Sequence, residues 1–340
     1  NKGLSRDELF SAEDLQQSPV LTDAVYVSVS DGQDVSVDSA GVWVLSGTAS
    51  ELTVCVDAGE TDAVQLVLDG LNIENRDLPC ILVRQAGKVH ITLLSDSALT
   101  VREGFRKDPE KKASAVVYSR ADLTLSGEGA LRISSPKNGI ICRDTLRITG
   151  GGFEISAASK AVAADNAIWI ADGSLRLAAG SDGLHAENGD DSRAGSVYIG
   201  GGSIAITAGD DGIHGQSLLQ IDGSTLSVSA DEGLEGTWVL INGGRLDIAA
   251  SGDGINAGFK SDAYRPKIEI NGGQLSIVMD GEDPDAIDSN EDLVITGGVI
   301  ELTGSGIDWD GELSFTGGTV ILDGQELDSI PNQSAHHLGS

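Results

Sequence analysis

Apolar and polar residues alternate with period two along most of the chain, in short runs that end at glycine. Such alternation is typical of strands that bury one face. Eight of the glycines form corners, each the second residue of a Gly-Gly, Asp-Gly or similar pair: Gly152, Gly173, Gly202, Gly223, Gly244, Gly273, Gly298 and Gly318. The corners recur about every 21 residues, and a repeat of that length usually indicates a solenoid.

Each repeat carries three apolar groups. One pair precedes the corner, as in Ile168 and Ile170, and a second pair follows it, as in Leu175 and Leu177. A single residue such as Leu184 closes the unit after an Asp-Gly turn. Three strands and three bends per repeat predict an all-β fold, a parallel β-helix, which short crossovers should make right-handed. A leucine-rich repeat would need a helical half, and a propeller blade about 40 to 45 residues.

The repeat also predicts the domain organisation. A solenoid grows by adding coils, so residues 25–332 are expected to form a single elongated domain. Residues 1–24 carry Ser5 and Glu8 at capping-box spacing, which predicts a short helix that covers the open end of the solenoid. Residues 333–340 break the repeat and are expected to be a disordered tail or an expression remnant.

Composition narrows the partners. The chain has 53 acidic against 22 basic residues and a formal charge of -31, which argues against nucleic acid and favours cations, unless the acids serve solubility alone. No apolar run approaches the ~18 residues of a membrane span, although a lipid anchor upstream stays possible. Cys55, Cys80 and Cys142 lack metal spacing and are expected to fill core positions. We expect a monomer.

Acidic residues recur at the third bend of successive coils. One row reads Asp182, Asp211, Glu232, Asp253 and Asp285, and a second row, three residues later, reads His185, His214, Glu235, Asn256, Asp288 and Asp308. We call this double row the acidic ladder. Equivalent positions should stack ~4.8 Å apart, where two carboxylates repel by about 0.9 kcal/mol in water and about 3.5 kcal/mol at an effective dielectric of 20.

Such a row can be relieved by bound cations, by raised carboxyl pKa values, or by side chains that point into solvent. Many oxygen ligands without cysteine favour Ca²⁺ over zinc or magnesium. His185 and His214 are expected to hydrogen-bond to neighbouring acids. The alternative interpretation, that Asp-Gly is simply a favoured turn pair, explains the glycine better than the acid.

Two repeats have 29 residues, eight more than the usual 21, and the extra residues follow the same turn. The insertions are residues 188–193 and 258–265 with their flanks. They should form two walls of a groove above the turns at Asp211 and Glu232, unless they are merely tolerated surface loops. Further calcium ligands are expected from Asp190, Asp191 and Asp210. Contacts to a bound sugar are expected from Arg193, Lys260, Tyr264 and Arg265.

Trp169 and Tyr198 are outward residues of adjacent coils. An exposed aromatic pair of this kind offers a platform for the apolar face of a sugar ring. An ordinary cross-strand stack is the alternative.

The order of the turn motifs resembles a known family. The motifs are Asp182-Gly-Leu-His-Ala186, Asp210-Asp-Gly-Ile-His214, Glu232-Gly-Leu-Glu-Gly236, Gly252-Asp-Gly-Ile-Asn-Ala257, Ala286-Ile-Asp-Ser-Asn290 and Ile307-Asp-Trp-Asp-Gly311. They are similar to those of secreted bacterial carbohydrate-binding β-helices with a pectate-lyase-like fold, described as binding cellulose and acid-sugar polymers with calcium. The resemblance implies an extracellular or surface-anchored protein. It favours as calcium ligands Asp182, Asp210, Asp211, Glu232, Glu235 and Asp253.

Three functions follow as hypotheses. The first is a non-catalytic, calcium-dependent protein that binds polysaccharide, either acidic or from plant cell walls. The second is a calcium-dependent polysaccharide lyase, whose base would be Arg193, Lys260 or Arg265. The third is a structural spacer on the cell surface.

Overall fold

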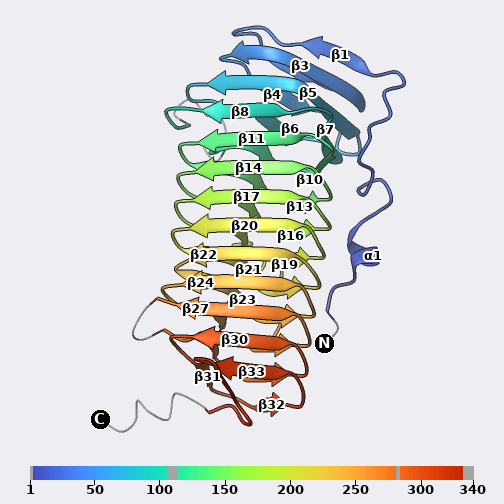
Figure 1. Ribbon diagram of the computed structural model, residues 1–340. Coiled ribbons are helices and arrows are strands. Elements are labelled where there is room, and N and C mark those ends of the chain that lie inside the picture. Colours follow the sequence, from blue (N-terminus) through green and yellow to red (C-terminus); the bar gives the residue numbers. More distant parts are fainter. Residues whose placement is uncertain (1–2, 106–112, 281–283, 332–340) are drawn as a thin grey trace.

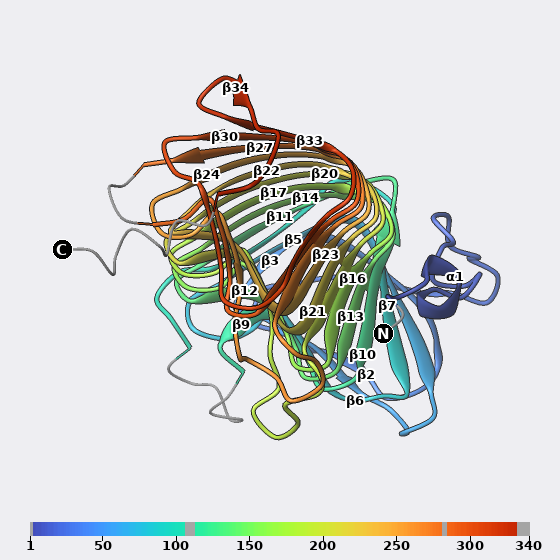
Figure 2. The ribbon, with the colours of Figure 1, turned by 90° about the horizontal axis from the view of Figure 1, so that it is seen from below.

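The computed structural model describes residues 3–105, 113–280 and 284–331. Within these ranges the one helix is α1 (Arg6–Leu9), and all other regular elements are β-strands. No helix there is long and apolar enough to cross a bilayer. The strands pair in parallel from coil to coil in an elongated stack (Figures 1 and 2). An all-β solenoid is thereby confirmed, and its right-handed sense stays a prediction.

The coils build three stacks of parallel strands. Stack 1 contains β1 (Val25–Ser28), β3 (Gly41–Ser50), β5 (Ala63–Asn75), β7 (Lys88–Leu93), β10 (Asp122–Gly127), β13 (Thr145–Ile148), β16 (Ala167–Ile170), β19 (Ser196–Ile199), β21 (Asp211–Ile221), β23 (Glu232–Ile241), β26 (Lys267–Ile270), β29 (Asp292–Ile295) and β32 (Leu313–Phe315). Stack 2 continues from the ends of β3 and β5 through β8 (Ser97–Val101), β11 (Ala130–Ser135), β14 (Gly152–Ala157), β17 (Ser174–Ala179), β20 (Ser203–Ala208), β22 (Thr225–Ala230), β24 (Arg245–Ala250), β27 (Gln274–Met279), β30 (Val299–Thr303) and β33 (Thr319–Leu322), with β34 (Gln325–Glu326) added antiparallel.

Stack 3 contains β2 (Val35–Val37), β4 (Val54–Asp57), β6 (Ile81–Gln85), β9 (Ala115–Ser119), β12 (Asn138–Cys142), β15 (Val162–Ala164), β18 (Leu184–Ala186), the first halves of β21 and β23, β25 (Ile255–Ala257), β28 (Ile287–Ser289) and β31 (Ile307–Trp309). The long strands β21 and β23 run from stack 3 into stack 1 without a loop. The early coils, which have looser spacing in the sequence, pair in parallel in the same way.

The inward residues of all three stacks form one aliphatic core. Ile168, Leu175 and Leu184, one from each stack, are at most 2 % exposed. Full burial of such a side chain stabilises the fold by about 1.5–3 kcal/mol, so every coil contributes a similar amount. On β4, Val54 and Val56 point inward, and Cys55 between them is therefore only half-buried.

The cysteine prediction is accordingly correct for two positions and wrong for one. Cys80 and Cys142 are buried in the core, whereas Cys55 lies outside it. None of the three forms a disulfide bond within the described residues.

Close contact between coils explains the glycine of the Asp-Gly turns. A Cβ atom on Gly233 would lie 2.3 Å from the carbonyl oxygen of Gly254 in the next coil. No side chain fits at that distance, so stacking demands glycine here. It makes no such demand on the acidic residue before the glycine.

The N-terminal segment (residues 3–24) was predicted to cover the open end of the solenoid, and this prediction is wrong. It lies along the side of stack 1 and runs opposite to the order of the coils (Figures 1 and 2). The backbone N–H of Leu4 donates to Gln220 Oε1, and Gln17 Nε2 donates to the carbonyl oxygen of Thr149. Helix α1 has only four residues, and the side chain of Ser5 makes no capping bond. Contacts this distant in sequence leave no local signal.

A buried ion pair fixes the middle of this segment. The Asp14 carboxylate is 2 % exposed and accepts hydrogen bonds from Lys88 Nζ at 2.5 Å and from Thr124 Oγ1 at 2.8 Å. Burial opposes its ionisation, but Lys88 and Ser11 hold the pKa of Asp14 well below its usual value. The segment is therefore an integral part of the fold. The predicted tail, residues 333–340, lies outside the described residues.

Candidate functional site: the acidic ladder of stack 3

The acidic ladder lies on adjacent strands of stack 3. In the second row, His185 pairs with His214 and His214 with Glu235. The pairing then continues through Asn256 to Asp288 and Asp308. Inward neighbours such as Leu234 hold each strand against the core, so the row presents its side chains on the outer surface of the solenoid.

Basic groups neutralise the first coils of the ladder. Lys160 is one coil ahead of Asp182 in the same register, and its Nζ lies 2.9 Å from Asp182 Oδ2. His185 Nδ1 contacts the same oxygen at 2.7 Å, without hydrogen-bond alignment. Although burial opposes ionisation, these two neighbours hold the pKa of Asp182 well below its usual value. Asp182 is thus a compensated carboxylate.

The next two coils are compensated in the same way. His214 Nδ1 is hydrogen-bonded to Glu235 Oε2 at 2.5 Å and to Asp211 Oδ2 at 3.2 Å, and Lys260 Nζ contacts Glu235 Oε1. Burial opposes protonation of His214, but the two carboxylates raise its pKa to about 9. Burial likewise opposes ionisation of Glu235, yet His214 and Lys260 lower its pKa to about 2. The protonated imidazole thus lies between two carboxyl groups, and burial, with the charge of Glu235, raises the pKa of the second one, Asp211.

The expected hydrogen bonds of both histidines to acids are therefore present, since His185 Nε2 is hydrogen-bonded to Glu187 Oε2 at 3.0 Å. The imidazole of His185 also stacks on that of His214 with centroids 4.7 Å apart. Asp211, His214 and Glu235 place their ligand atoms within 4.8 Å of one another, close enough to surround a metal ion. Since Nδ1 of His214 already bonds both carboxylates, a metal there would have to displace those contacts.

Glu232 marks the boundary of the compensated part. Its Oε2 accepts a hydrogen bond from Asn256 Nδ2 at 3.2 Å. Burial, with the added repulsion of Glu235, raises the pKa of Glu232 to about 7.

Beyond Glu232 the ladder contains oxygen donors without basic partners. Among the described residues, no lysine, arginine or histidine side chain contacts Asp253, Asp288 or Asp308. Burial raises the pKa of Asp253, with further increases from Glu235 and Asp231. Burial and the charges of Asp253, Asp285, Asp308 and Asp310 raise the pKa of Asp288 to about 7. Without a cation, the folded chain therefore resists full ionisation of this group.

An amide oxygen adds to this oxygen set. Asn256 Oδ1 is buried and has no hydrogen-bond partner in the described structure, while its Nδ2 is held by Glu232. An unpartnered buried acceptor costs about 1–3 kcal/mol, which a bound cation would recover. Ca²⁺ takes six to eight oxygen ligands in flexible geometry, so the chemistry of Asp253, Asn256, Asp288 and Asp308 fits that ion. The side-chain donors of the compensated coils fit it less well, because lysine and histidine already occupy them.

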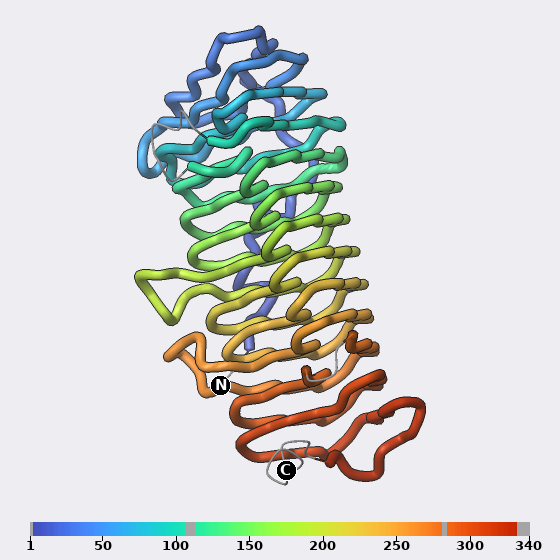
Figure 3. Tube along the Cα trace, turned by 90° about the vertical axis from the view of Figure 1, so that its left-hand side faces the viewer, coloured from blue at the N-terminus to red at the C-terminus, as the bar shows by residue number. Residues whose placement is uncertain are grey.

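The two insertions lie on one edge of the solenoid, as expected (Figure 3). Ser192 Oγ of the first donates to Asp262 Oδ2 of the second at 3.2 Å, so the loops meet above β21 and β23. Lys260 reaches from the second loop to Glu235 of the ladder. The insertions thus contact both each other and the acidic row.

Three predicted ligands stand apart from the ladder. Asp190 and Asp191 are exposed in the first insertion, where their backbone N–H groups donate to Asn188 Oδ1. Asp210 is exposed next to Asp211. The structure therefore brings together the other seven: Asp182, Asp211, Glu232, Glu235, Asp253, Asn256 and Asp288.

The predicted sugar contacts are distributed differently from expectation. Arg265 is paired with Glu291 and Asp292, and the Tyr264 ring packs edge-on against Trp238 at 5.3 Å. Arg193 is exposed. With Lys260 bound to Glu235, two of the three basic side chains are engaged in ion pairs.

The predicted aromatic platform is wrong. Tyr198 is 1 % exposed because Leu9 and Phe10 of the N-terminal segment cover it, with the Phe10 ring 6.2 Å away. Trp169 is half-buried under the same segment and donates to Ser196 Oγ at 3.3 Å. The outward row that contains Trp169 and Tyr198 is therefore the surface on which the N-terminal segment packs.

Sequence reasoning missed two features. Lys160 occupies the coil position of Asp182, so extending the alignment by one coil would have revealed it. His90 lies on stack 1 beneath the N-terminal segment, and no spacing in the sequence indicates that contact.

Known proteins resemble this chain in sequence. A carbohydrate-binding domain-containing protein of Acetivibrio thermocellus is 37 % identical over 136 residues, which are 38 % of this chain and 47 % of that protein. The chain thus spans about half the length of this relative. A solved structure of a polysaccharide lyase-like protein from C. thermocellum, a gadolinium derivative, aligns at 22 % identity and a TM-score of 0.38 over 88 % of this chain and 94 % of that one. A family model described as carbohydrate-binding domain-containing protein matches residues 31–238 and 229–326, and the chain belongs to that family.

Proposed function

We propose that this protein binds acidic polysaccharide through Ca²⁺ held by the last coils of the acidic ladder. Its family supports carbohydrate binding in general. The calcium, the acidic sugar and the site are our inference from the side chains of stack 3.

One observation carries the proposal. Asp253, Asn256, Asp288 and Asp308, which we call the oxygen-only group, lie on successive coils, with Asn256, Asp288 and Asp308 in register, and Asn256 Oδ1 is buried without a hydrogen-bond partner in the described structure. Ca²⁺ would supply two positive charges there, with coordination positions left for an external ligand. The chain's residues would hold the ion on a rigid sheet, since Asn256, Asp288 and Asp308 are on strands that pair with one another.

Charge explains why the sugar would need the ion. A uronate polymer is a polyanion, and a protein with a formal charge of -31 repels it. A cation shared between protein carboxylates and uronates turns that repulsion into attraction. Lys260 and Arg265 cannot serve this purpose readily, because both are paired with acids of the chain.

The same pairing favours binding over catalysis. A lyase needs a base that is free to remove the proton next to the uronate carboxylate. Burial opposes protonation of Lys260, but its contact with Glu235 raises its pKa and keeps it a poor base at neutral pH. We therefore propose a binding protein. A sustained rise in the ultraviolet absorbance of unsaturated uronate product, with polygalacturonate and calcium, would contradict it.

We also propose that the protein works outside the bacterial cell. Extracellular calcium modules bind the ion with Kd values of about 10⁻⁴–10⁻³ M, and a partly exposed group of carboxylates suits that range. Fractionation of the source cells, followed by detection with an antibody, tests this location. Recovery in the cytoplasm alone would refute it.

The main test is a glycan-binding assay run with calcium and with EDTA. Acidic polysaccharides should bind only with calcium, and neutral polymers should show no calcium dependence at the ladder. The matched variant is Asp288→Asn, which removes one charge from the oxygen-only group and keeps its shape. Undiminished retention of polygalacturonate in EDTA would overturn the proposal.

A further inference from the structure

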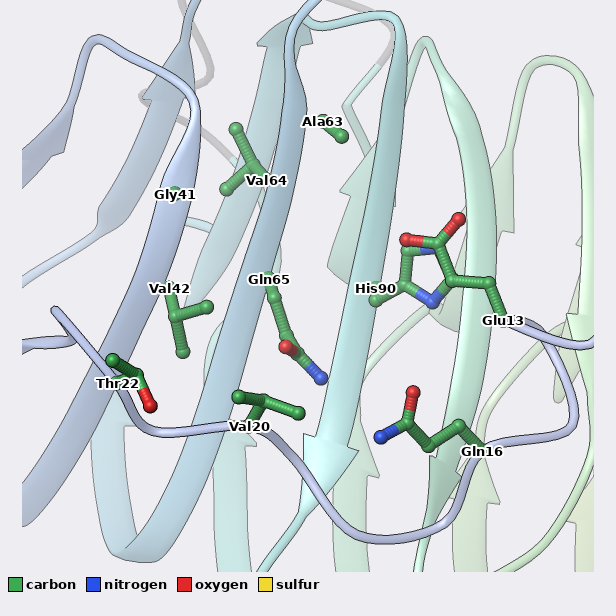
Figure 4. Close-up of a pocket in the computed structure, with 10 residues that line it drawn as sticks. All are labelled: Glu13, Gln16, Val20, Thr22, Gly41, Val42, Ala63, Val64, Gln65 and His90. Carbon is green, nitrogen blue, oxygen red and sulfur yellow. The ribbon is translucent and has the colours of Figure 1, made fainter.

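A cleft separates the N-terminal segment from the early strands of stack 1, far from the acidic ladder. Its volume is about 340 Å³, within the range of small-molecule sites. Figure 4 shows the residues that line it, which are Glu13, Gln16, Val20, Thr22, Gly41, Val42, Ala63, Val64, Gln65 and His90. They come from the segment on one side and from β3, β5 and β7 on the other.

His90 is the unusual residue of this cleft. The whole residue is 5 % exposed, and Nε2 is buried without a hydrogen-bond partner among the described residues. The nearest acid, Glu13, places Oε1 3.9 Å from Nε2, too far for a hydrogen bond. Burial, with the nearby charge of Lys88, lowers the pKa of His90, so the ring is neutral at physiological pH. A neutral imidazole offers one donor and one acceptor.

The other polar groups are of the same neutral kind. Gln16, Gln65 and Thr22 contribute two amides and a hydroxyl to the lining. Gln65 Nε2 donates to Thr92 Oγ1 at 2.9 Å, which fixes the orientation of that amide. Glu13 is the one acidic residue in this lining, which contains no lysine or arginine. A phosphate or a uronate would find no cation here.

Apolar side chains complete the cleft. The outward side chain of Val42 forms part of its wall, and Val20 on the segment is 60 % exposed at its rim. An exposed valine beside neutral donors and acceptors matches a ligand with both C–H faces and hydroxyl groups. Pyranose rings have this chemistry.

We propose that this cleft binds one neutral sugar unit, with His90 as the central hydrogen-bonding residue. The inference rests on the proposed function in so far as that function makes saccharides the ligands. It adds a second binding site, which needs no calcium and is separated from the ladder by several coils. The two sites would let one solenoid hold a neutral sugar unit and an acidic region of the same polysaccharide.

The direct test follows the imidazole signals of ¹⁵N-histidine-labelled protein by NMR in EDTA. The probes are methyl glycosides of glucose, galactose, mannose and xylose, each added to tens of millimolar. Binding should move the ring signals of His90, assigned with the variant His90→Gln, while those of His185 and His214 stay in place. A panel in which no probe moves the His90 signals would overturn the proposal.

A blocking variant tests the location. Ala63 is exposed on β5 at the cleft, and Ala63→Trp should fill the space and abolish the shift of His90. The matched control is Ala249→Trp, an exposed alanine on β24 outside this cleft, which should bind the probe like the parent chain. Equal binding by both variants would place the sugar elsewhere and refute the site.

Failure of this inference and failure of the calcium proposal give different results. If the ladder does not bind calcium, the His90 signals still respond to a neutral sugar in EDTA. If the cleft does not bind sugar, Ala63→Trp has no effect on sugar binding, and Asp288→Asn alone weakens binding of acidic polysaccharide.

Discussion

The two halves of the acidic ladder share one backbone and differ in their charges. In the earlier coils, lysine and histidine lie against Asp182, Asp211 and Glu235. Asp253, Asp288 and Asp308 of the later coils have no lysine, arginine or histidine partner in the described structure. The same register therefore holds a self-compensated cluster in one half and a group that calls for an external cation in the other.

This difference shows that stacking acidic turns does not by itself define a metal site. Parallel coils bring equivalent side chains close together whatever their charge. The identity of the neighbouring coils then decides whether a carboxylate is neutralised by the chain or by solvent ions. In the first half, the carboxylates are neutralised by Lys160, His214 and Lys260.

The largest expected effect concerns calcium affinity. Replacing Asp253 and Asp288 together by asparagine should weaken calcium binding by about 100-fold, since two charges of the oxygen-only half are lost, equivalent to about 2.8 kcal/mol. Isothermal titration calorimetry at neutral pH measures it. The control Asp182→Asn, in the compensated half, should change affinity by less than about threefold. A loss of equal size in both variants would contradict the comparison.

The second effect is a pH dependence in the compensated half. The folded-state pKa of His214 is raised to about 9, above the usual 6.5. Its stabilisation is therefore complete below about pH 6.5 and lost as the pH rises through about 9. The free energy of unfolding should fall by about 3 kcal/mol in His214→Gln at acidic to neutral pH, and the difference should vanish above about pH 9.

Urea unfolding of the parent protein and of His214→Gln across this pH range, in EDTA, measures the difference between their free energies of unfolding. The replacement His185→Gln is the matched control, since that ring stacks on His214 but contacts a different acid. A penalty for His214→Gln that stays constant through alkaline pH would disprove the charged imidazole.

A third experiment converts one half toward the other. Among the described residues, Lys260→Met leaves Glu235 with His214 as its one basic partner, so the melting temperature should fall by an amount equivalent to about 1 kcal/mol. The cost is small because Lys260 is 40 % exposed. Calcium should raise the melting temperature of this variant more than that of the parent chain. An identical calcium response would mean that Lys260 does not exclude cations from the first half.

The smallest effect is expected at the first insertion. Asp190→Asn combined with Asp191→Asn should change calcium affinity by less than about twofold, because both carboxylates are exposed and stand apart from the ladder. Calorimetry under the conditions used for the ladder variants gives the comparison. A loss near that of the Asp253 and Asp288 pair would assign calcium to the insertion.

Much of the ladder could be predicted because its geometry is a repeat. The alignment of Glu235, Asn256 and Asp288 follows from counting residues between corners, and the strand pairing agrees. Their partners could be predicted only in part. Lys160 lay within reach of the same counting, whereas Lys260 reaches Glu235 from an insertion whose path no repeat dictates.

The N-terminal segment shows the other limit. Tyr198 has the period-two position of an exposed strand residue, and local pattern alone predicts that it faces solvent. Leu9 and Phe10, nearly 190 residues away in the chain, bury it instead. Burial of an outward face depends on which distant segment docks there, and a pattern within one strand carries no such information.

By itself, the sequence determined the coil. Period-two alternation and closely spaced glycines act within a few residues, so the three strands, the aliphatic core and the rows of stacked side chains follow from local rules. Tertiary structure alone decided which acids receive a cation from the chain, where the first residues lie, and that His90 is left unpartnered beside a cleft. Each of these depends on side chains from distant parts of the chain meeting in three dimensions, and their energies are set by burial and charge at that meeting point.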